Sequence, residues 1–303
     1  MFFRALSIAF LGLSLCACSS GSDVYDSPLS AELDGMMVHT FEQGELTREY
    51  IVYTPASYDD TQALPVLFAF HGNGGRADWF VGETDMLELA DAENFILVYP
   101  QGSLLDGTPH WNPSPPGEGN KSSTDDLAFV SGMLDMLTNN YGVDASRIYA
   151  CGYSNGAFMT FGLACGMSEH FAAVGGVSGT MLGGTEGCEP AHPMPVISLN
   201  GTEDAVVPYA GGLGYPSSDE VLEFWRDFNG IIGEPSVTSA EDSGMVIERT
   251  HYEGGEKGAA ITRYKFEGGQ HVWFTERFEG SSTGQLIWDF VSQYDLQGLR
   301  AAE

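Results

Sequence analysis

Basic residues are scarce in this sequence of 303 residues. Lys and Arg together number 12, whereas Asp and Glu number 42, so the formal net charge at pH 7 is -30. A surface this acidic repels the phosphate backbone of DNA and RNA, which argues against a nucleic-acid partner. The charge indicates either a neutral or weakly charged substrate or simply solubility in an exported protein, and composition does not separate these two interpretations.

The sequence also lacks a hydrophobic run long enough to span a bilayer. The apolar run at 5–15 follows Arg4 and has the size of a signal-peptide core. The residues after it, up to Cys18, resemble the lipobox of bacterial lipoproteins. We therefore expect a lipoprotein signal peptide at 1–18, with Cys18 as the lipidated N-terminus, and a flexible tether at 19–35. The alternative is ordinary signal peptidase cleavage near Ala17, followed by release.

Cysteine is rare as well: the chain has five, and two of them lie in the expected leader. Of the other three, Cys151 falls in an expected core strand, whereas Cys165 and Cys188 flank a connection that a bridge would close. In an oxidising compartment we therefore expect a disulfide between Cys165 and Cys188. No spacing resembles a zinc or redox motif, so no metal site is expected.

No repeat, low-complexity linker or second composition block follows residue 30, which predicts one catalytic domain over 36–303. Within it, short apolar runs typical of buried strands alternate with helix-like stretches. Strands are expected at 49–55, 64–70, 95–99, 147–152, 171–177, 195–200, 246–252 and 260–266. Helices are expected at 86–94, at 124–141 with Thr124 or Ser123 as N-cap, at 157–164 and at 282–294. This alternation predicts an α/β fold with a mostly parallel central sheet flanked by helices.

The most informative segment is Gly152-Tyr153-Ser154-Asn155-Gly156, between an expected strand and an expected helix. A G-x-S-x-G in this setting is typical of a nucleophile elbow, in which a strained turn exposes the serine hydroxyl. The pentapeptide alone also arises by chance in a chain with 39 Gly. Its position between strand and helix favours Ser154 as a nucleophile.

A serine nucleophile needs a base, an acid that orients the base, and donors for the oxyanion. Asp204 follows the expected strand 195–200, and His271 follows the expected strand 260–266. This is the order nucleophile, acid, histidine found in α/β-hydrolases. We therefore predict Asp204 as the acid and His271 as the base, with Glu203 as an alternative acid one residue away.

The segment His71-Gly72-Asn73-Gly74-Gly75 ends the apolar strand at 64–70, where this fold supplies an oxyanion donor. We expect the backbone N–H groups of Asn73 and Asn155 to bind the oxyanion, with Gly74 as the next candidate. His71 is expected to brace this loop beside the substrate pocket rather than to transfer protons. A generic glycine turn is the alternative for the segment.

Together these motifs resemble the poly(3-hydroxybutyrate) depolymerase and feruloyl esterase family of secreted α/β-hydrolases, which includes bacterial lipoproteins. The resemblance covers about residues 46–295 and rests on the segments 71–75, 152–157, 200–209 and 268–273. It implies an α/β-hydrolase fold that needs no cofactor. It also implies the triad Ser154, Asp204 and His271 and a bridge between Cys165 and Cys188.

Two residues depart from the family pattern. Asn200 stands where the family usually has His, and Gln270 stands where Gly commonly precedes the catalytic His. Both leave the triad intact and would alter only the edge of the pocket. We place Tyr153, Trp111 and Trp273 at the pocket, where the two Trp rings either form an aromatic wall for the substrate or simply pack under loops.

These residues predict a secreted serine carboxylesterase that acts through an acyl-enzyme. The expected substrates are small or oligomeric esters: feruloyl or acetyl side-chain esters of polysaccharides, or hydroxyalkanoate oligomers. We expect a monomer that meets the membrane only through its lipid anchor, at the outer membrane, cell surface or periplasm, and that is otherwise extracellular. Two alternatives stay open: an envelope acyltransferase with the same triad, and a non-catalytic, lipid-anchored binding protein on a hydrolase scaffold.

Overall fold

The computed structural model describes residues 28–30, 35–117, 120–212 and 214–301. The expected signal peptide, with Cys18, lies outside these residues, as does most of the expected tether. The described part of the tether contacts the domain, since Leu29 is buried and the Ser30 N–H donates to Asp78 at 3.1 Å.

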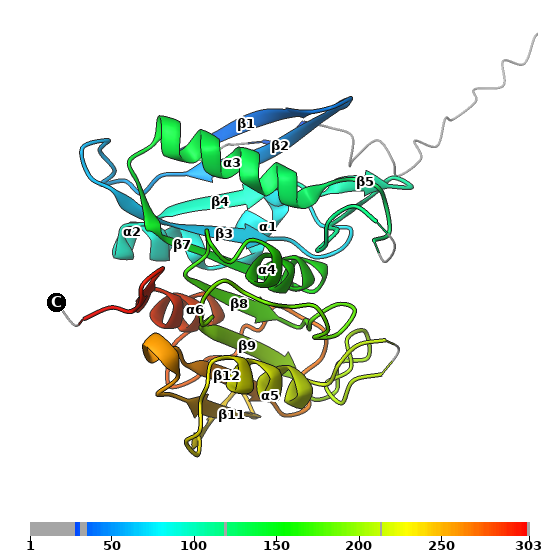
Figure 1. Ribbon diagram of the computed structural model, residues 1–303, viewed down its shortest axis with the longest axis vertical. Helices are drawn as coiled ribbons and strands as arrows, with labels where there is room; N and C mark the ends of the chain where they lie inside the picture. Colours follow the sequence, from blue (N-terminus) through cyan, green and yellow to red (C-terminus); the bar gives the residue numbers. More distant parts are fainter. Residues whose placement is uncertain (1–27, 31–34, 118–119, 213, 302–303) are drawn as a thin grey trace, which may run out of the picture.

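A ten-stranded sheet runs through the described part of the chain in the order β1-β2-β4-β3-β7-β8-β9-β12-β11-β10 (Figure 1). From β4 to β12 in this order the strands are parallel, and the strands outside them pair antiparallel. The strands are β1 (Met36–Gln43), β2 (Leu46–Tyr53), β3 (Leu64–Phe70), β4 (Ile96–Pro100), β7 (Val143–Tyr153), β8 (Ala173–Val177), β9 (Val196–Gly201), β10 (Ser236–Asp242), β11 (Met245–Tyr252) and β12 (Ile261–Phe266). Short hairpins are formed by β5 (Ser103–Leu105) with β6 (Thr108–His110) and by β13 (Tyr294–Asp295) with β14 (Gly298–Leu299).

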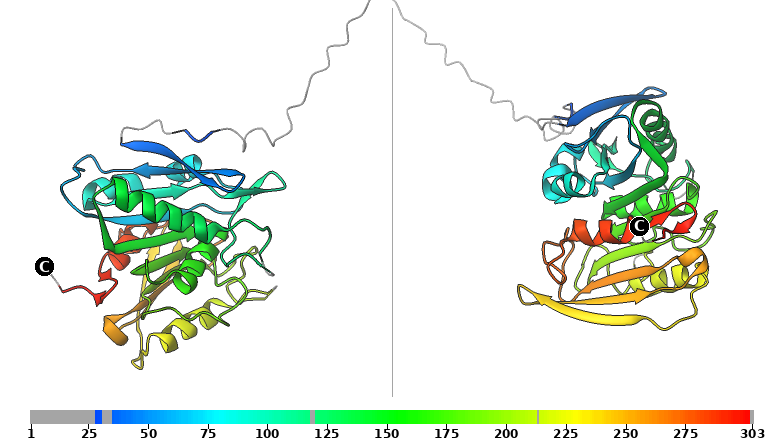
Figure 2. Two further views of the ribbon diagram at one scale, coloured as in Figure 1. Left: turned by 45° about the horizontal axis from the view of Figure 1, so that its top comes forward. Right: turned by 90° about the vertical axis from the view of Figure 1, so that its left-hand side faces the viewer.

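Helices cover both faces of the sheet (Figures 1 and 2). They are α1 (Ala77–Glu83), α2 (Met86–Glu93), α3 (Asp126–Asn140), α4 (Asn155–Gly166), α5 (Ser218–Phe228) and α6 (Thr283–Val291), with a 3-10 turn at Glu256–Gly258. Side chains of β3 point alternately into two hydrophobic clusters: Leu67 packs with α1, α2 and α6, and Phe68 packs with α3, α4 and α5. Burial on both faces explains why this strand is almost wholly apolar.

The predicted α/β-hydrolase architecture is confirmed, and each expected strand and helix is present with its ends shifted by a few residues. The structure adds β1, α1, α5, β10 and the short hairpins, which the sequence interpretation missed. The N-cap of α3 is Asp125, whose side chain accepts from the Ala128 N–H at 2.9 Å, rather than Thr124 or Ser123. None of the described helices is both long and apolar enough to cross a membrane.

The predicted disulfide is present. Cys165 near the end of α4 is bonded to Cys188, with their Cα atoms 4.8 Å apart. Cys151 is a free thiol buried in β7, and burial raises its pKa well above the ordinary value. It is therefore a small apolar side chain of the core, as the strand pattern predicts.

The register of the parallel strands brings four loops together at one edge of the sheet. Phe70 pairs with Gly152, so the loops after β3 and β7 leave the sheet side by side. Phe266 pairs with Gly201, so the loops after β9 and β12 do the same. Ligand sites of open α/β sheets form at such carboxyl ends of strands, and all the predicted catalytic residues follow these four strands.

Candidate active site

Ser154 lies at the sharp turn between β7 and α4, with φ 56° and ψ -117°. A non-glycine residue with such dihedrals is strained, which is typical of a nucleophile elbow. The flanking glycines make the turn possible: an added Cβ would lie 2.3 Å from the carbonyl oxygen of Gly156 at position 152, and 2.1 Å from that of Phe70 at position 156. Both glycines of the pentapeptide therefore serve close backbone contacts.

The serine hydroxyl is hydrogen-bonded to a histidine, which is in turn hydrogen-bonded to a carboxylate. His271 Nε2 is 2.8 Å from Ser154 Oγ, and His271 Nδ1 is 2.7 Å from Asp204 Oδ2. Because a carboxylate only accepts, Nδ1 carries the proton, and the Nε2 lone pair of the neutral ring faces the hydroxyl. This geometry suits proton abstraction from Ser154.

Backbone donors fix the second carboxylate oxygen of Asp204. Its Oδ1 accepts from the N–H groups of Val206 and Val207, each at 2.8 Å. The alternative acid, Glu203, is exposed, and its carboxylate instead accepts from the side chain of Gln270 at 3.2 Å. Asp204 is therefore the carboxylate that orients His271.

Two hydroxyls hold the backbone of the histidine loop. The Tyr153 hydroxyl donates to the carbonyl of His271 at 2.9 Å, and Ser178 Oγ donates to the carbonyl of Val272 at 2.7 Å. Burial, with a smaller effect of the Asp204 carboxylate, raises the pKa of Tyr153 to about 12, which keeps its hydroxyl a donor at neutral pH. Tyr153 thus positions the base, and its ring lies 5.2 Å from the His271 ring.

Two backbone N–H groups are available for an oxyanion. Asn155 is the first residue of α4, where a helix N–H has no intrahelical acceptor. Asn73 is exposed in the loop after β3, and its N–H has no acceptor among the described residues. The Gly74 N–H, by contrast, donates to the carbonyl of Pro109 at 2.8 Å. This leaves Asn73 and Asn155 as the pair that matches the predicted oxyanion hole.

Trp111 connects the loops that carry these two donors. Its indole N–H donates to the carbonyl of His71 at 2.9 Å, and its backbone N–H donates to the Asn155 side chain at 2.7 Å. The Asn155 side-chain amide in turn donates to the Trp111 carbonyl at 3.1 Å. Only 1% of Trp111 is exposed, so the prediction that it lines the substrate pocket is wrong. The ring packs under the loops because its N–H has a buried partner there.

His71 is buried to the same degree and cannot line an open pocket either, although it braces the loop as predicted. Its Nε2 accepts from the Gly102 N–H at 3.0 Å, and its Nδ1 donates to the carbonyl of Gly72 at 2.7 Å. Burial, the largest effect, lowers the pKa of His71 to about 4. The His71 ring is therefore neutral at physiological pH and has a structural role.

Trp273 lies two residues after the base, is half-buried and packs edge-on against Phe80 of α1, with ring centroids 5.5 Å apart. Tyr153 is also half-buried. These two side chains remain candidates for contact with substrate. No group of three or more His, Cys, Asp or Glu side chains in the described residues is placed to hold a metal ion.

Sequence reasoning missed the residues that support the oxyanion loops. The Gln101 side chain accepts from the Ala77 N–H at 2.9 Å and lies 3.2 Å from His71 Nε2. A buried ion pair joins Arg48 of β2 to Asp126 of α3 at 2.8 Å, and Asp126 also accepts from the backbone N–H next to Trp111. No motif marks these residues, because their partners lie far away in the sequence.

Comparisons with known proteins agree with this geometry. A family model described as Esterase PHB depolymerase matches residues 48–210. The chain is 27% identical over 262 residues to feruloyl esterase B of Piromyces equi, covering 82% of this chain and 46% of that protein. It is 27% identical over 261 residues to a bifunctional acetylxylan esterase/xylanase of Neocallimastix patriciarum, covering 85% and 35% respectively. The chain thus spans about half, or less, of the length of these relatives.

Solved structures share the fold at low sequence identity. An acetyl xylan esterase from Aspergillus awamori matches with a TM-score of 0.62 and 16% identity, over 84% of this chain and 99% of that chain. A ferulic acid esterase from Anaeromyces mucronatus matches with a TM-score of 0.54 and 15% identity, over 90% and 95% respectively. At these identities the likeness shows the α/β-hydrolase fold.

Proposed function

This chain belongs to the PHB depolymerase family of esterases, and from that membership we propose that it is an exported serine carboxylesterase. The observation that carries the proposal is that His271 bridges Ser154 and Asp204, with hydrogen bonds of 2.8 and 2.7 Å. A serine hydroxyl paired with an oriented imidazole is the arrangement that acyl transfer requires. The disulfide supports export, because such bonds persist in oxidising compartments.

In the proposed reaction, His271 Nε2 takes the proton of the Ser154 hydroxyl while Oγ attacks the carbonyl carbon of the ester. The N–H groups of Asn73 and Asn155 bind the resulting oxyanion. The intermediate collapses as the imidazolium donates its proton to the leaving alcohol, which leaves an acyl group on Oγ. Water then repeats the cycle: His271 accepts its proton, the hydroxide displaces the acyl group, and the proton returns to Oγ.

The names of the similar proteins support a class of substrate. They are named as feruloyl and acetylxylan esterases, which supports an ester substituent on a polysaccharide as the substrate. Hydroxyalkanoate oligomers are the second class that the family name supports. The acidic chain favours esters without a negative charge next to the scissile bond.

Hydrolysis of p-nitrophenyl acetate tests the proposal. We expect the wild-type domain to release p-nitrophenol, and Ser154→Ala to lower kcat by about 10⁴-fold or more because no nucleophile remains. Ser239→Ala, on the exposed strand β10, is the matched control and should retain wild-type activity. Undiminished turnover by Ser154→Ala would overturn the mechanism, and an inactive wild type would favour the binding-protein alternative.

A further inference from the structure

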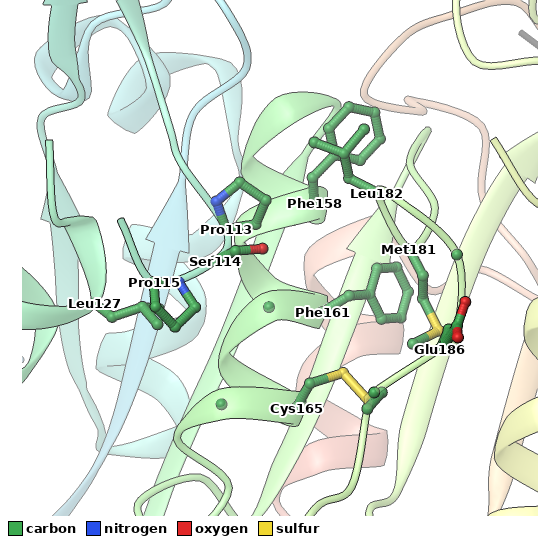
Figure 3. Close-up of a pocket in the computed structure, with 15 residues that line it drawn as sticks. Pro113, Ser114, Pro115, Leu127, Phe158, Phe161, Cys165, Met181, Leu182 and Glu186 are labelled. Carbon is green, nitrogen blue, oxygen red and sulfur yellow. A yellow bond between two sulfur atoms is a disulfide. The ribbon is translucent and has the colours of Figure 1, made fainter. Parts of the chain in front are cut away.

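A pocket of about 270 Å³ lies along one side of α4, outside the catalytic constellation (Figure 3). Its α4 lining consists of Phe158, Phe161, Gly162, Cys165 and Gly166. Their spacing of three and four residues puts them on one face of the helix. Since pockets for drug-sized ligands have volumes of about 300–1,000 Å³, this pocket suits a fragment such as a chain or a single ring.

The pocket extends along the helix from the nucleophile. Ser154 is the N-cap of α4, and Phe158, the first α4 residue of the lining, lies about one helical turn after it. At 1.5 Å of rise per residue, the pocket begins about 6 Å along the helix axis from Ser154 and ends near Gly166, at about 18 Å. Figure 3 shows this direction, with Phe158 and Leu182 at one end and Cys165 at the other.

Both side walls of the pocket continue from segments that contact the nucleophile elbow. The wall at Pro113, Ser114 and Pro115 follows Trp111, whose backbone is bonded to the Asn155 side chain. The opposite wall, 181–188, follows β8, whose last carbonyl, that of Val177, accepts from the Ser154 N–H at 2.9 Å. Apart from Leu127 of α3, the pocket is therefore lined by α4 and by two segments that contact the nucleophile elbow.

The disulfide holds the second wall in place. Gly183, Gly184 and Gly187 all have positive φ, with no other atom within 4 Å of an added Cβ, so little packing restrains the wall at these glycines. Cys188 attaches its far end to Cys165 on the floor of the pocket. The bridge thus fixes the width of the pocket.

The buried side chains that line the pocket are apolar, whereas acidic residues are exposed at its edge and beside it. Phe158, Phe161 and Met181 are buried side chains, whereas Glu186 is an exposed residue that lines the pocket. A neighbouring depression shares Gly184 with the pocket and is lined by Glu220, Glu223 and Asp227. An apolar group gains from burial here, whereas a ligand that ends in a carboxylate is repelled.

We infer that this pocket binds the acyl chain of the ester and gives the enzyme a preference for uncharged apolar acyl groups larger than acetyl. The inference rests on the proposed esterase function. The acyl side is assigned because His271 protonates the leaving alcohol, which must therefore lie on the His271 side. No residue of the loop after β12 lines the pocket.

Leu182→Trp tests the inference, since Leu182 is a half-buried wall residue and a larger side chain would fill the near end. For wild type we expect kcat/KM for p-nitrophenyl octanoate to exceed that for the acetate. The variant should lower this ratio about tenfold, mainly by raising KM for octanoate. With wild type, a p-nitrophenyl ester whose eight-carbon acyl chain ends in a carboxylate should not have a higher kcat/KM than the acetate. The matched control is Leu46→Trp, at an exposed position of β2, which should keep the wild-type ratio.

A second variant fills the end of the pocket that is farther from Ser154. Position 166 does not have positive φ, and an added Cβ would meet only Leu127, at 3.6 Å, so Gly166→Phe fills space without backbone strain. It should lower kcat/KM for p-nitrophenyl hexadecanoate, whose extended chain is long enough to reach this end, more than for octanoate. The inference is overturned if both variants keep the wild-type chain-length ratios, or if wild type shows no preference over acetate. Failure to hydrolyse even the acetate would instead refute the proposed function.

Discussion

His71 is buried beneath the loop that carries Asn73, and its hydrogen bonds fit only the neutral ring. Its Nε2 accepts from the Gly102 N–H, so a proton at Nε2 would face a donor. In the unfolded chain the imidazole titrates near its ordinary value, whereas in the folded protein its pKa is about 4. The unfolded state therefore binds more protons between these two pH values.

Stability is expected to fall as the pH decreases from about 6.5 to 4, because protonation of His71 then favours the unfolded chain. By linkage, the shift corresponds to about 3 kcal/mol of unfolding free energy that is present above pH 6.5 and lost as the pH falls through 4. Urea titrations at pH 7 and pH 4.5 measure this change. His71→Gln should show a smaller loss than wild type, whereas the exposed-site control His170→Gln should match wild type; equal losses in all three would contradict the assignment.

The residues of the proposed triad could be predicted one by one because each has a local signal. Ser154 has its flanking glycines, and Asp204 and His271 each follow an apolar strand run. Trp111 has no such signal: its burial depends on contacts with residue 71, 40 positions away, and with residue 155, 44 positions away. Sequence patterns therefore identified the three side chains that the structure brings together, but they misplaced Trp111.

At the scale of elements, the buried strands were predicted, whereas the edge strands and two helices were missed. The buried strands β3 and β4 are apolar on both faces and are therefore visible as runs. The helix α5 was missed although Ser217 and Glu220 form a capping box, a signal that the sequence does carry. The residues of the edge strands β1 and β10 are exposed or half-buried, so neither strand shows the continuous apolar run that marks a buried strand.

The bridge between α4 and the wall at 181–188 also allows a prediction at this scale. Its residues are 23 positions apart, so its loss should cost about 3 kcal/mol of unfolding free energy by the chain-entropy relation. The double variant Cys165→Ser, Cys188→Ser should therefore unfold about 5–10 °C lower in a thermal scan. Reductant should lower the Tm of wild type but not of the variant, and equal Tm values without reductant would refute a stabilising role.

At the scale of the whole molecule, the acidic composition and the N-terminal segment together bear on whether the protein is attached to a membrane. A net charge of -30 opposes adsorption to anionic lipid headgroups, so stable membrane attachment would need a covalent anchor. We propose that Cys18, which lies outside the described residues, carries that anchor. A folded domain with this charge would otherwise leave the membrane.

Expression of the full chain in a bacterial host that processes lipoproteins tests this proposal. Wild type should sediment with membranes, and Cys18→Ser should move to the soluble fraction because it cannot be acylated. Cys16→Ser is the matched control within the same segment and should remain with the membranes. If Cys18→Ser still sediments, the lipobox interpretation is wrong.

The parallel register of the central strands makes ester turnover depend on folding of most of the domain. The four loops of the site follow β3, β7, β9 and β12, which together extend over most of the domain sequence. A fragment that contains both the triad and the oxyanion donors must run at least from Asn73 to His271, and it therefore includes β7, β9 and β12. Forming the site requires long-range parallel pairing, the slowest kind of contact to form during folding. Ester turnover is therefore a measure of complete folding as well as of chemistry, which makes a simple colour reaction a readout of native strand register.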